Sequence, residues 1–311
     1  MAEDLTAALP PRAVHPYVWA VIIRLAALLG VLLAMSGCSA AGSAEIGYPD
    51  GTSAHTMTFG GLNRTYRLYK PADLPPSAPL VVMLHGGFGT GEQAEESYGW
   101  DQLADSAKFI VAYPDGIGRA WNVHGCCGQP ARDGIDDVGF ITAMVGQISD
   151  SLGVDRSRVY ATGISNGGML SYTLACNSGI FAAIGPDSAT QLDACTAPHP
   201  TSVMHIHGTA DRLIPYRGGQ GASVVNGPSV ADVNAFWRNA DQCGPPAVTA
   251  DGPVTTSTAG CADTRSVVLI TIDGGGHQWP GGTTFLERGD PMSKALNATQ
   301  TFWQFFAAHP A

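Results

Sequence analysis

Positively charged residues are scarce in this chain. Its 311 residues include 16 lysines and arginines against 26 aspartates and glutamates, which gives a formal net charge of −10 at pH 7. A nucleic-acid-binding surface needs a basic patch or stripe that neutralises phosphates, and the sequence contains no such stripe. Nucleic acid is therefore excluded as an expected partner, and the acidic balance is explained by solubility.

The sequence also lacks the cysteine spacing of a structural zinc site. None of its seven cysteines belongs to a Cys-x-x-Cys pair, a spacing in which zinc sites commonly supply their ligands. His205 and His207 lie two residues apart in a predicted strand, so they share one face of it. We interpret them as packed residues rather than metal ligands, and we expect the protein to use neither a metal nor another cofactor.

The most informative motif that is present is Gly-x-Ser-x-Gly at residues 163–167. The run before it favours a strand, and the apolar pattern of residues 169–174 favours a helix. A serine on such a sharp strand-to-helix turn needs glycines on either side, because a Cβ would collide with the neighbouring strand and helix. The string alone carries little weight in a chain with 39 glycines, but in this context it predicts Ser165 as a nucleophile.

A nucleophilic serine needs a histidine that takes its proton and an acid that orients the histidine. A buried strand predicted at residues 202–208 leads into Asp211, and another at residues 267–272 leads into His277 on a glycine-rich loop. Taken separately, Asp211 could be a helix cap and His277 a turn residue. Loops that leave the same edge of a parallel sheet meet at one crevice, and the order Ser, Asp, His suits this kind of turn. We therefore expect Ser165, Asp211 and His277 to form a catalytic triad.

Backbone N–H donors for an oxyanion are predicted beside Ser165. A strand at residues 80–84 ends in His85-Gly86-Gly87, where glycines allow the backbone to approach a substrate closely. With a nucleophile of this type, one donor is the residue after the serine and the other lies in the loop after an earlier strand. We therefore predict the N–H groups of Asn166 and Gly87 as the oxyanion donors.

Strand and helix patterns alternate through the body of the chain, which favours an α/β fold with a mainly parallel sheet and helices on both faces. Strands are predicted at residues 66–69, 80–84, 109–113 and 159–164, and helices at residues 94–107, 138–152 and 292–307. Asp136 and Asp137 are interpreted as the cap and first-turn acid of a helix rather than as a paired-carboxylate site. Residues 218–227, rich in glycine, are expected to form a surface loop near the mouth of the site.

Seven ordered motifs together resemble the polyhydroxybutyrate depolymerase and feruloyl esterase family, and within it the LpqC-type lipoprotein esterases. They are His85-Gly86-Gly87, Trp121-Asn122, Cys126-Cys127-Gly128, Asp136-Asp137-Val138-Gly139-Phe140, Gly163-Ile164-Ser165-Asn166-Gly167-Gly168, His207-Gly208-Thr209-Ala210-Asp211 and Gly276-His277-Gln278-Trp279-Pro280-Gly281. The similarity extends from about Thr58 to the C-terminus. It implies an α/β-hydrolase that cleaves carboxylic esters through Ser165, Asp211 and His277.

The same resemblance implies three substrate-binding residues. Trp121 and Trp279 match family positions that flank the site, where a flat aromatic side chain can pack on a sugar, a phenolic acid or an acyl chain. Core packing is the alternative interpretation for both tryptophans. His85 is expected to line the substrate site with them, but the motifs leave the substrate itself open.

The N-terminal region predicts that the protein is located outside the cytoplasm. Arg24 precedes an apolar run at residues 25–35, which is long enough for a signal peptide but short for a membrane span. The string Ser36-Gly37-Cys38 then resembles a bacterial lipobox, in which the peptide is cleaved before the cysteine and the thiol carries a diacylglyceryl group. The run extends back to Tyr17 if Arg24 is tolerated, so an uncleaved signal anchor is the alternative.

This pattern divides the chain into three parts. Residues 1–37 are the expected lipoprotein signal peptide, residues 38–53 a small-residue tether that begins at the lipidated Cys38, and residues 54–311 the catalytic domain. The expected location is extracytoplasmic, as a cell-surface lipoprotein anchored to the membrane or as a secreted protein.

Cysteine usage supports export. Without the lipidated cysteine an even six remain, as expected for disulfides formed in an oxidising compartment. Cys243 and Cys261 bracket one loop rich in glycine, proline and threonine, and we predict that they pair. The other four, which allow three connectivities, are Cys126, Cys127, Cys176 and Cys195. Adjacent Cys126 and Cys127 are expected to bond to separate partners, because a bridge between neighbours strains the peptide.

These features predict a lipid-anchored, cofactor-independent serine esterase that acts as a monomer on a small-molecule or wall-linked ester. An insoluble polyester is a less favoured substrate, because no separate binding domain follows the predicted terminal helix. Two alternatives stay open. One is a cell-envelope acyltransferase that passes the acyl group to a sugar hydroxyl through the same triad, and the other is a non-catalytic binding lipoprotein that keeps the scaffold.

Overall fold

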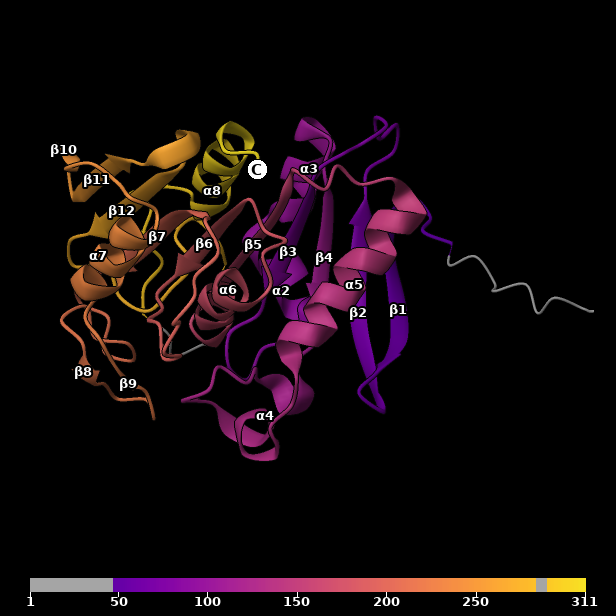
Figure 1. The fold of residues 1–311 in the computed structure, drawn as a ribbon, viewed down its shortest axis with the longest axis horizontal. Coiled ribbons are helices and arrows are strands. Elements are labelled where there is room, and N and C mark those ends of the chain that lie inside the picture. Colours follow the sequence, from indigo (N-terminus) through magenta and orange to yellow (C-terminus); the bar gives the residue numbers. More distant parts are fainter. Residues whose placement is uncertain (1–46, 284–289) are drawn as a thin grey trace, which may run out of the picture. The chain divides into compact units, whose positions relative to one another are not determined.

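The computed structural model of the chain describes residues 47–283 and 290–311 (Figure 1). The predicted signal peptide, Cys38 and most of the predicted tether lie outside the described residues. Among the helices of these two ranges, none combines the length and the apolar character that crossing a membrane requires.

A ten-stranded sheet forms the centre of the described fold. From one edge to the other, its strands are β1 (Gly51–Phe59), β2 (Leu62–Lys70), β4 (Ile110–Pro114), β3 (Leu80–Leu84), β5 (Val159–Ile164), β6 (Ala183–Asp187), β7 (Ser202–Gly208), β12 (Ser266–Ile272), β11 (Val254–Gly260) and β10 (Ala247–Asp251). The six neighbouring strands from β4 to β12 pair in parallel. Two antiparallel strands extend the sheet at each edge.

Burial along the strands follows from their place in the sheet. Five of the parallel strands, β3 to β7, are buried at every position, as expected where helices cover both faces of a sheet and the strands are near-continuous apolar runs. At the edges, β1 alternates between half-buried and exposed residues, and β10 is exposed throughout.

Helices cover the two faces of the sheet (Figure 1). One buried cluster receives side chains from α5 (Asp137–Leu152), α6 (Asn166–Asn177) and α7 (Val230–Ala240), and the other from α2 (Gly91–Tyr98), α3 (Trp100–Ala107) and α8 (Ala298–Ala308). Short elements lie in the connections: η1 (Ile117–Arg119), α4 (Gly128–Asp133), the ribbon of β8 (Gly219–Gln220) and β9 (Asn226–Gly227), and η2 (Ala262–Thr264). The predicted architecture, a mainly parallel sheet with helices on both faces, is confirmed.

Three boundaries differ from those predicted. The helix expected at residues 94–107 is two helices, because Gly99 takes a left-handed conformation with φ of 72° and ends α2. The terminal helix begins at Ala298 instead of residue 292, because the Asn297 side chain caps it by accepting from Gln300 N at 2.9 Å. Strand β1 begins at Gly51, so residues 51–53 of the expected tether belong to the sheet.

The start of α5 agrees with the prediction for the two aspartates. Asp136 Oδ1 accepts from Gly139 N at 2.7 Å and caps the helix. Asp137 lies in the first turn, where it also forms a buried ion pair with Arg64 at 2.7 Å. Its other oxygen accepts from Asn122 N at 2.8 Å, so this helix terminus holds the loop that follows β4.

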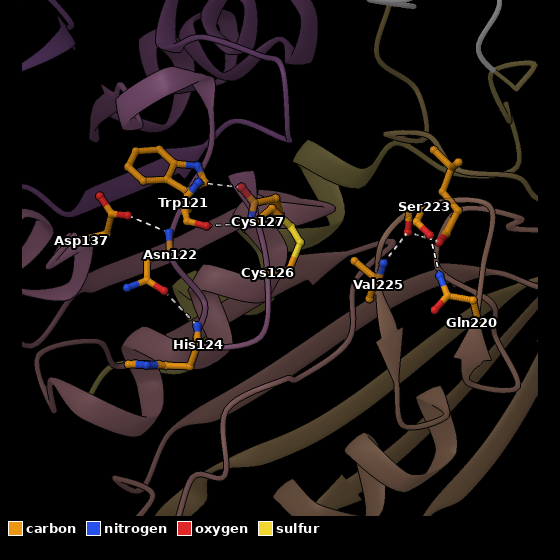
Figure 2. Close-up of a disulfide and its surroundings, with 11 residues drawn as sticks. Trp121, Asn122, His124, Cys126, Cys127, Asp137, Gln220, Ser223 and Val225 are labelled. Atoms are coloured by element: carbon orange, nitrogen blue, oxygen red, sulfur yellow. Dashed lines mark hydrogen bonds between the residues drawn. A yellow bond between two sulfur atoms is a disulfide. The ribbon is translucent and has the colours of Figure 1, made fainter. Parts of the chain in front are cut away.

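The disulfides are in part as predicted. Cys243 and Cys261 are bonded, which confirms that pairing, and Cys176 bonds to Cys195. The prediction that Cys126 and Cys127 bond to separate partners is wrong, because they are bonded to each other. Since the other four cysteines of the domain pair among themselves, each of these two has only its neighbour there. Figure 2 shows this disulfide beside Trp121, with Cys127 N donating to Trp121 O at 3.3 Å.

Candidate active site

The turn between β5 and α6 has the strand-turn-helix geometry predicted for the Gly-x-Ser-x-Gly motif. Ser165 occupies it with φ of 56° and ψ of −122°, a conformation that costs free energy for a residue other than glycine. A Cβ on Gly163 would lie 2.6 Å from Leu84 O, and a Cβ on Gly167 would lie 2.2 Å from the same atom. Both glycines are therefore needed for α6 to start this close to β3.

The predicted oxyanion loop lies against this turn. A Cβ on Gly86 would lie 3.6 Å from Ser165 Cβ, and a Cβ on Gly87 would lie 4.0 Å from Asn166 Cβ. The backbone of Gly87 thus runs beside the first residue of α6. The N–H groups in the first turn of a helix have no partner within the helix. This arrangement brings together the two positions predicted as donors.

The side chain of Asn166 is buried and bonds to the backbone of Trp121, so it does not face a substrate. It is 2% exposed, its Oδ1 accepts from Trp121 N at 2.7 Å, and its Nδ2 donates to Trp121 O at 3.1 Å. These paired bonds fix the start of α6 to the loop after β4. The sequence placed Trp121 near the serine without revealing that its backbone makes the link.

His85 also has a structural role, because it bonds only to backbone groups. Its side chain is fully buried, Nε2 accepts from Gly116 N at 2.9 Å, and Nδ1 lies 2.8 Å from Gly86 O, to which it donates. Burial lowers the pKa of His85, which favours this neutral form. Both ring nitrogens are occupied by backbone groups, so the expectation that His85 lines the substrate site is not met, and the ring instead holds the glycine loop.

Asp211 and His277 meet at the carboxyl ends of neighbouring strands β7 and β12. The His277 Nδ1 and Asp211 Oδ2 atoms are 2.8 Å apart, and Asp211 Oδ1 accepts from Leu213 N at 2.9 Å and from Ile214 N at 2.8 Å. Burial opposes ionisation of Asp211, but hydrogen bonds from His207 and His277 outweigh it and hold the pKa of this carboxyl below its usual value. The carboxylate is thus anionic and aimed at the imidazole.

His277 is partly accessible, with a side-chain exposure of 12%. Its backbone N–H donates to Asp290 Oδ2 at 2.7 Å. Asp290 is a residue that the sequence reasoning missed, because nothing in its local pattern indicates that it returns to the histidine loop.

The serine turn and the histidine loop are both attached to the carboxyl end of β6, at Asp187 and Ser188. Ser165 N donates to Asp187 O at 2.9 Å, and Ser188 Oγ lies 3.4 Å from Gln278 O. Within the described residues, no hydrogen bond joins Ser165 Oγ to His277. In enzymes without bound substrate this contact is often long and tightens in the reacting complex.

Asp187 is a second buried carboxyl beside the site, and the sequence reasoning missed it. Neither of its oxygens has a hydrogen-bond partner within residues 47–283 and 290–311, and the residue has no exposed surface. Burial raises the pKa of Asp187 well above its usual value, the charge of Asp211 adds to the shift, and the nearby Ser188 hydroxyl opposes it only in part. These surroundings therefore favour the neutral form of the carboxyl.

The two tryptophans predicted to flank the substrate are packed in the interior. Trp121 is 0% and Trp279 is 1% exposed. Trp121 Nε1 donates to His85 O at 2.9 Å, and Trp279 Nε1 donates to Thr299 Oγ1 at 3.0 Å. Core packing, the alternative interpretation, is therefore what the structure has. The exposed aromatic side chain at the glycine loop is Phe88, which is 79% exposed.

A cleft of about 510 Å³ opens on the far side of the glycine loop, between β1, β2 and the segments around Gly89 and Arg119. Neither Ser165 nor His277 lines it. We therefore do not assign it to the reacting ester. The sequence-predicted residues that the structure does bring together are the serine turn, its two donor positions and the Asp211–His277 pair.

Comparisons of sequence found a matching family profile and named relatives. The profile of the family described as "Esterase PHB depolymerase" matches residues 64–242. NocK of Nocardia uniformis subsp. tsuyamanensis, a protein named as an esterase, is 33% identical over 262 aligned residues, with 75% of this chain and 75% of the relative covered. Feruloyl esterase C of Emericella nidulans is 32% identical over 260 residues, with 79% of this chain and 84% of the relative covered.

Comparisons of structure agree with the fold. Acetyl xylan esterase from Aspergillus awamori superimposes with a TM-score of 0.60 at 18% identity, covering 82% of this chain and 99% of that one. Esterase 2 of Thermogutta terrifontis, in a structure phosphonylated by cyclosarin, gives a TM-score of 0.54 at 16% identity, covering 83% of this chain and 94% of that one. The shared architecture is the α/β-hydrolase fold.

Proposed function

The chain belongs to the esterase PHB depolymerase family, and from this premise we propose that it is a serine carboxylic-ester hydrolase with Ser165, Asp211 and His277 as its catalytic triad. The observation that carries the proposal is the 2.8 Å contact between Asp211 Oδ2 and His277 Nδ1, with the serine on a constrained turn at the same edge of the sheet. The carboxylate makes His277 Nδ1 the donor, which leaves Nε2 free to accept a proton.

The reaction follows from these roles. As Ser165 Oγ attacks the ester carbonyl, His277 Nε2 takes the serine proton and Asp211 stabilises the resulting imidazolium. The tetrahedral oxyanion is stabilised by the N–H groups of Gly87 and Asn166, each typically worth about 3 kcal/mol in such a site. His277 then gives its proton to the leaving alcohol, and water attacks the acyl-enzyme with the same histidine as base.

The substrate class is proposed from the relatives. Feruloyl esterase C and acetyl xylan esterase are named for esters of a phenolic acid and of a polysaccharide. Soluble or wall-linked esters with a short or aromatic acyl group are thus the proposed substrates. No separate cofactor is required by this mechanism.

The protein is proposed to act outside the cytoplasm, anchored through a lipid on Cys38. Three disulfides in the described residues support an oxidising compartment. The lipobox-like string at residues 36–38 supports the anchor.

The proposal predicts that Ser165→Ala abolishes activity. Initial rates on p-nitrophenyl acetate to palmitate and on methyl ferulate should fall by roughly a thousandfold or more, and stoichiometric labelling by a fluorophosphonate probe should be lost. Ser151→Ala, at an exposed position of α5, is the matched control and should label and turn over as the wild type does. Labelling that survives in Ser165→Ala would show that another residue is the nucleophile.

A further inference from the structure

A line of three buried polar side chains leads to Asp211 from the interior of the protein. They are Tyr172 of α6 and His205 and His207 of β7, each with no exposed surface. The Tyr172 hydroxyl is 3.0 Å from His205 Nδ1, and His205 Nε2 is 3.0 Å from His207 Nδ1. His207 Nε2 is 2.9 Å from Ile214 O and 3.4 Å from Asp211 Oδ2. The line therefore runs without interruption from the middle of α6 to the carboxylate.

The proton positions in this line follow from its last member. His207 Nε2 faces only acceptors, a carbonyl and a carboxylate, so it must carry the hydrogen. In a neutral ring Nδ1 is then an acceptor, and His205 Nε2 must donate to it. By the same reasoning His205 Nδ1 accepts, and the Tyr172 hydroxyl donates. One set of tautomers satisfies every group: Tyr172 donates to His205, His205 donates to His207, and His207 Nε2 donates to Ile214 O and faces Asp211 Oδ2.

The surroundings favour this neutral arrangement. Burial lowers the pKa of His205 well below its usual value, and the neighbouring His207 lowers it further. Apart from His205 and Asp211, the titratable group packed against His207 is Tyr216. Its ring centroid lies 5.8 Å away, and its hydroxyl bonds to Thr271 Oγ1 at 2.8 Å.

We infer that His207 is a positioning residue of the active site, and that the line Tyr172–His205–His207 holds the Asp211 carboxylate in the orientation that serves His277. This inference rests on the proposed triad. Asp211 Oδ2 is shared between the two imidazoles, while Oδ1 is occupied by two backbone N–H groups. N–H groups therefore face both oxygens of the carboxylate and restrain its rotation away from His277. Hydrogen bonds in such a chain polarise one another, so a change at Tyr172 is felt at Asp211.

The first test reads the tautomers directly in the resting wild-type protein. In ¹⁵N-labelled histidine spectra at pH 7, with His207→Gln used for assignment, His205 and His207 should both carry a proton on Nε2 and none on Nδ1. A charged ring, or a proton on Nδ1 of either residue at pH 7, would reverse the direction of the line and overturn the inference. This readout does not depend on catalysis.

The second test compares two variants of His207. His207→Leu removes the donor to Asp211 and should lower kcat by roughly tenfold, the effect of losing one hydrogen bond to a charged group, with KM nearly unchanged. It should also raise the pKa of the acid limb of the kcat/KM profile, because a carboxylate with fewer donors stabilises the protonated form of His277 more strongly. His207→Gln, whose amide supplies an N–H at a similar reach, should recover most of the rate and return the acid limb toward the wild-type position.

If the two variants have the same kcat and neither moves the acid limb, His207 is a packing residue and the inference is wrong. Fluorophosphonate labelling of Ser165 separates this outcome from a failure of the proposed function, because His207 variants should still label at Ser165 although more slowly.

Tyr172→Phe tests the far end of the line without removing an imidazole. It should lower kcat by a few fold and shift the acid limb in the same direction as His207→Leu, since His205 Nδ1 loses its donor. Tyr160→Phe is the matched control. Tyr160 is equally buried but belongs to the core on the other face of the sheet, and its hydroxyl has no hydrogen-bond partner within the described residues. An equal effect of the two substitutions would contradict the inference.

Discussion

At the residue scale, two carboxyl groups at the ends of adjacent strands lie in surroundings that favour opposite protonation states. Asp211 receives two backbone N–H bonds and one from His277, and it is ionised. Asp187 has no hydrogen-bond partner for either oxygen among the described residues, and burial raises its pKa well above the usual value. A difference in solvent exposure does not explain their different pKa shifts, since both carboxyl groups are buried. The donors around each one decide which carries the charge.

The raised pKa of Asp187 predicts a pH-dependent effect of Asp187→Asn. In the unfolded chain this carboxyl ionises above about pH 4, whereas in the folded protein it holds its proton to higher pH, so its contribution to stability is lost as pH rises. The slope from one such group is at most about 1.4 kcal/mol per pH unit. Asp187→Asn removes the titration, so its free energy of unfolding relative to the wild type should increase from pH 4 to pH 8.

Urea unfolding at pH 4, 6 and 8 measures this difference. Asp150→Asn, at an exposed position of α5, is the surface control and should differ little from the wild type at each pH. A difference between Asp187→Asn and the wild type that stays constant with pH would show that Asp187 is charged in the folded protein.

At the scale of single elements, replacing a glycine by alanine should have opposite effects on stability in the turn that carries Ser165 and in the long helix α5. Gly167→Ala would put a Cβ 2.2 Å from a backbone carbonyl of β3, which only a shift of the chain can relieve. We expect a loss of more than about 2 kcal/mol of stability and a fall in activity of at least about a hundredfold, since small displacements of a nucleophile are costly.

Gly146→Ala is the matched substitution. A Cβ on Gly146 would meet no atom within 4 Å, and alanine is the better helix former by up to about 1 kcal/mol. This variant should therefore gain stability and keep its activity. Thermal unfolding and ester hydrolysis of both variants measure the contrast, and equal losses in the two would mean that the turn is less constrained than its geometry indicates.

Elements were predictable from sequence where a local signal marks them. The Asp136 cap indicates the start of α5, and the run of residues 80–84 indicates a buried strand because parallel strands are apolar on both faces. The break between α2 and α3 also has a local signal, which is Gly99 itself, because glycine readily takes the left-handed conformation seen there. The helical pattern of the sequence continues across this glycine, so the break was not predicted. The late start of α8 depends on Asn297, one polar residue within a longer pattern.

The site was predictable only in part. The Asp211–His277 contact follows from chain order and from loops that leave one sheet edge. The burial of Trp279 does not follow, because whether an aromatic ring beside a site faces a substrate or the core is decided by distant residues such as Phe302. The link from His205 to Tyr172 joins positions 33 residues apart in two elements, and no local pattern reports it.

At the scale of the whole molecule, the proposed lipid anchor on Cys38 can be tested directly. In a bacterium that processes lipoproteins, wild-type protein should incorporate labelled palmitate and partition into detergent, and its mature form should begin at Cys38. Cys38→Ser should abolish the label and leave a larger precursor, because cleavage of this type requires the lipidated cysteine.

Cys243→Ser is the control for this substitution. It also removes one thiol, but that cysteine belongs to a disulfide of the domain, so the palmitate label and the size of the mature protein should stay as in the wild type. If Cys38→Ser left the size and the membrane association unchanged, the uncleaved signal anchor would be the correct interpretation of residues 17–35.

The exposed outer strand β10 has a consequence for assembly. A strand at the edge of a sheet presents unpaired N–H and C=O groups on which another chain can build. Here the strand has only five residues, Pro245 and Pro246 precede it, and Gly252 and Pro253 follow it. Proline has no N–H to donate to a ladder, so pairing cannot extend past either end. At this edge the sheet therefore stops in a segment that is a poor template for the addition of a further strand, which disfavours edge-to-edge pairing through β10.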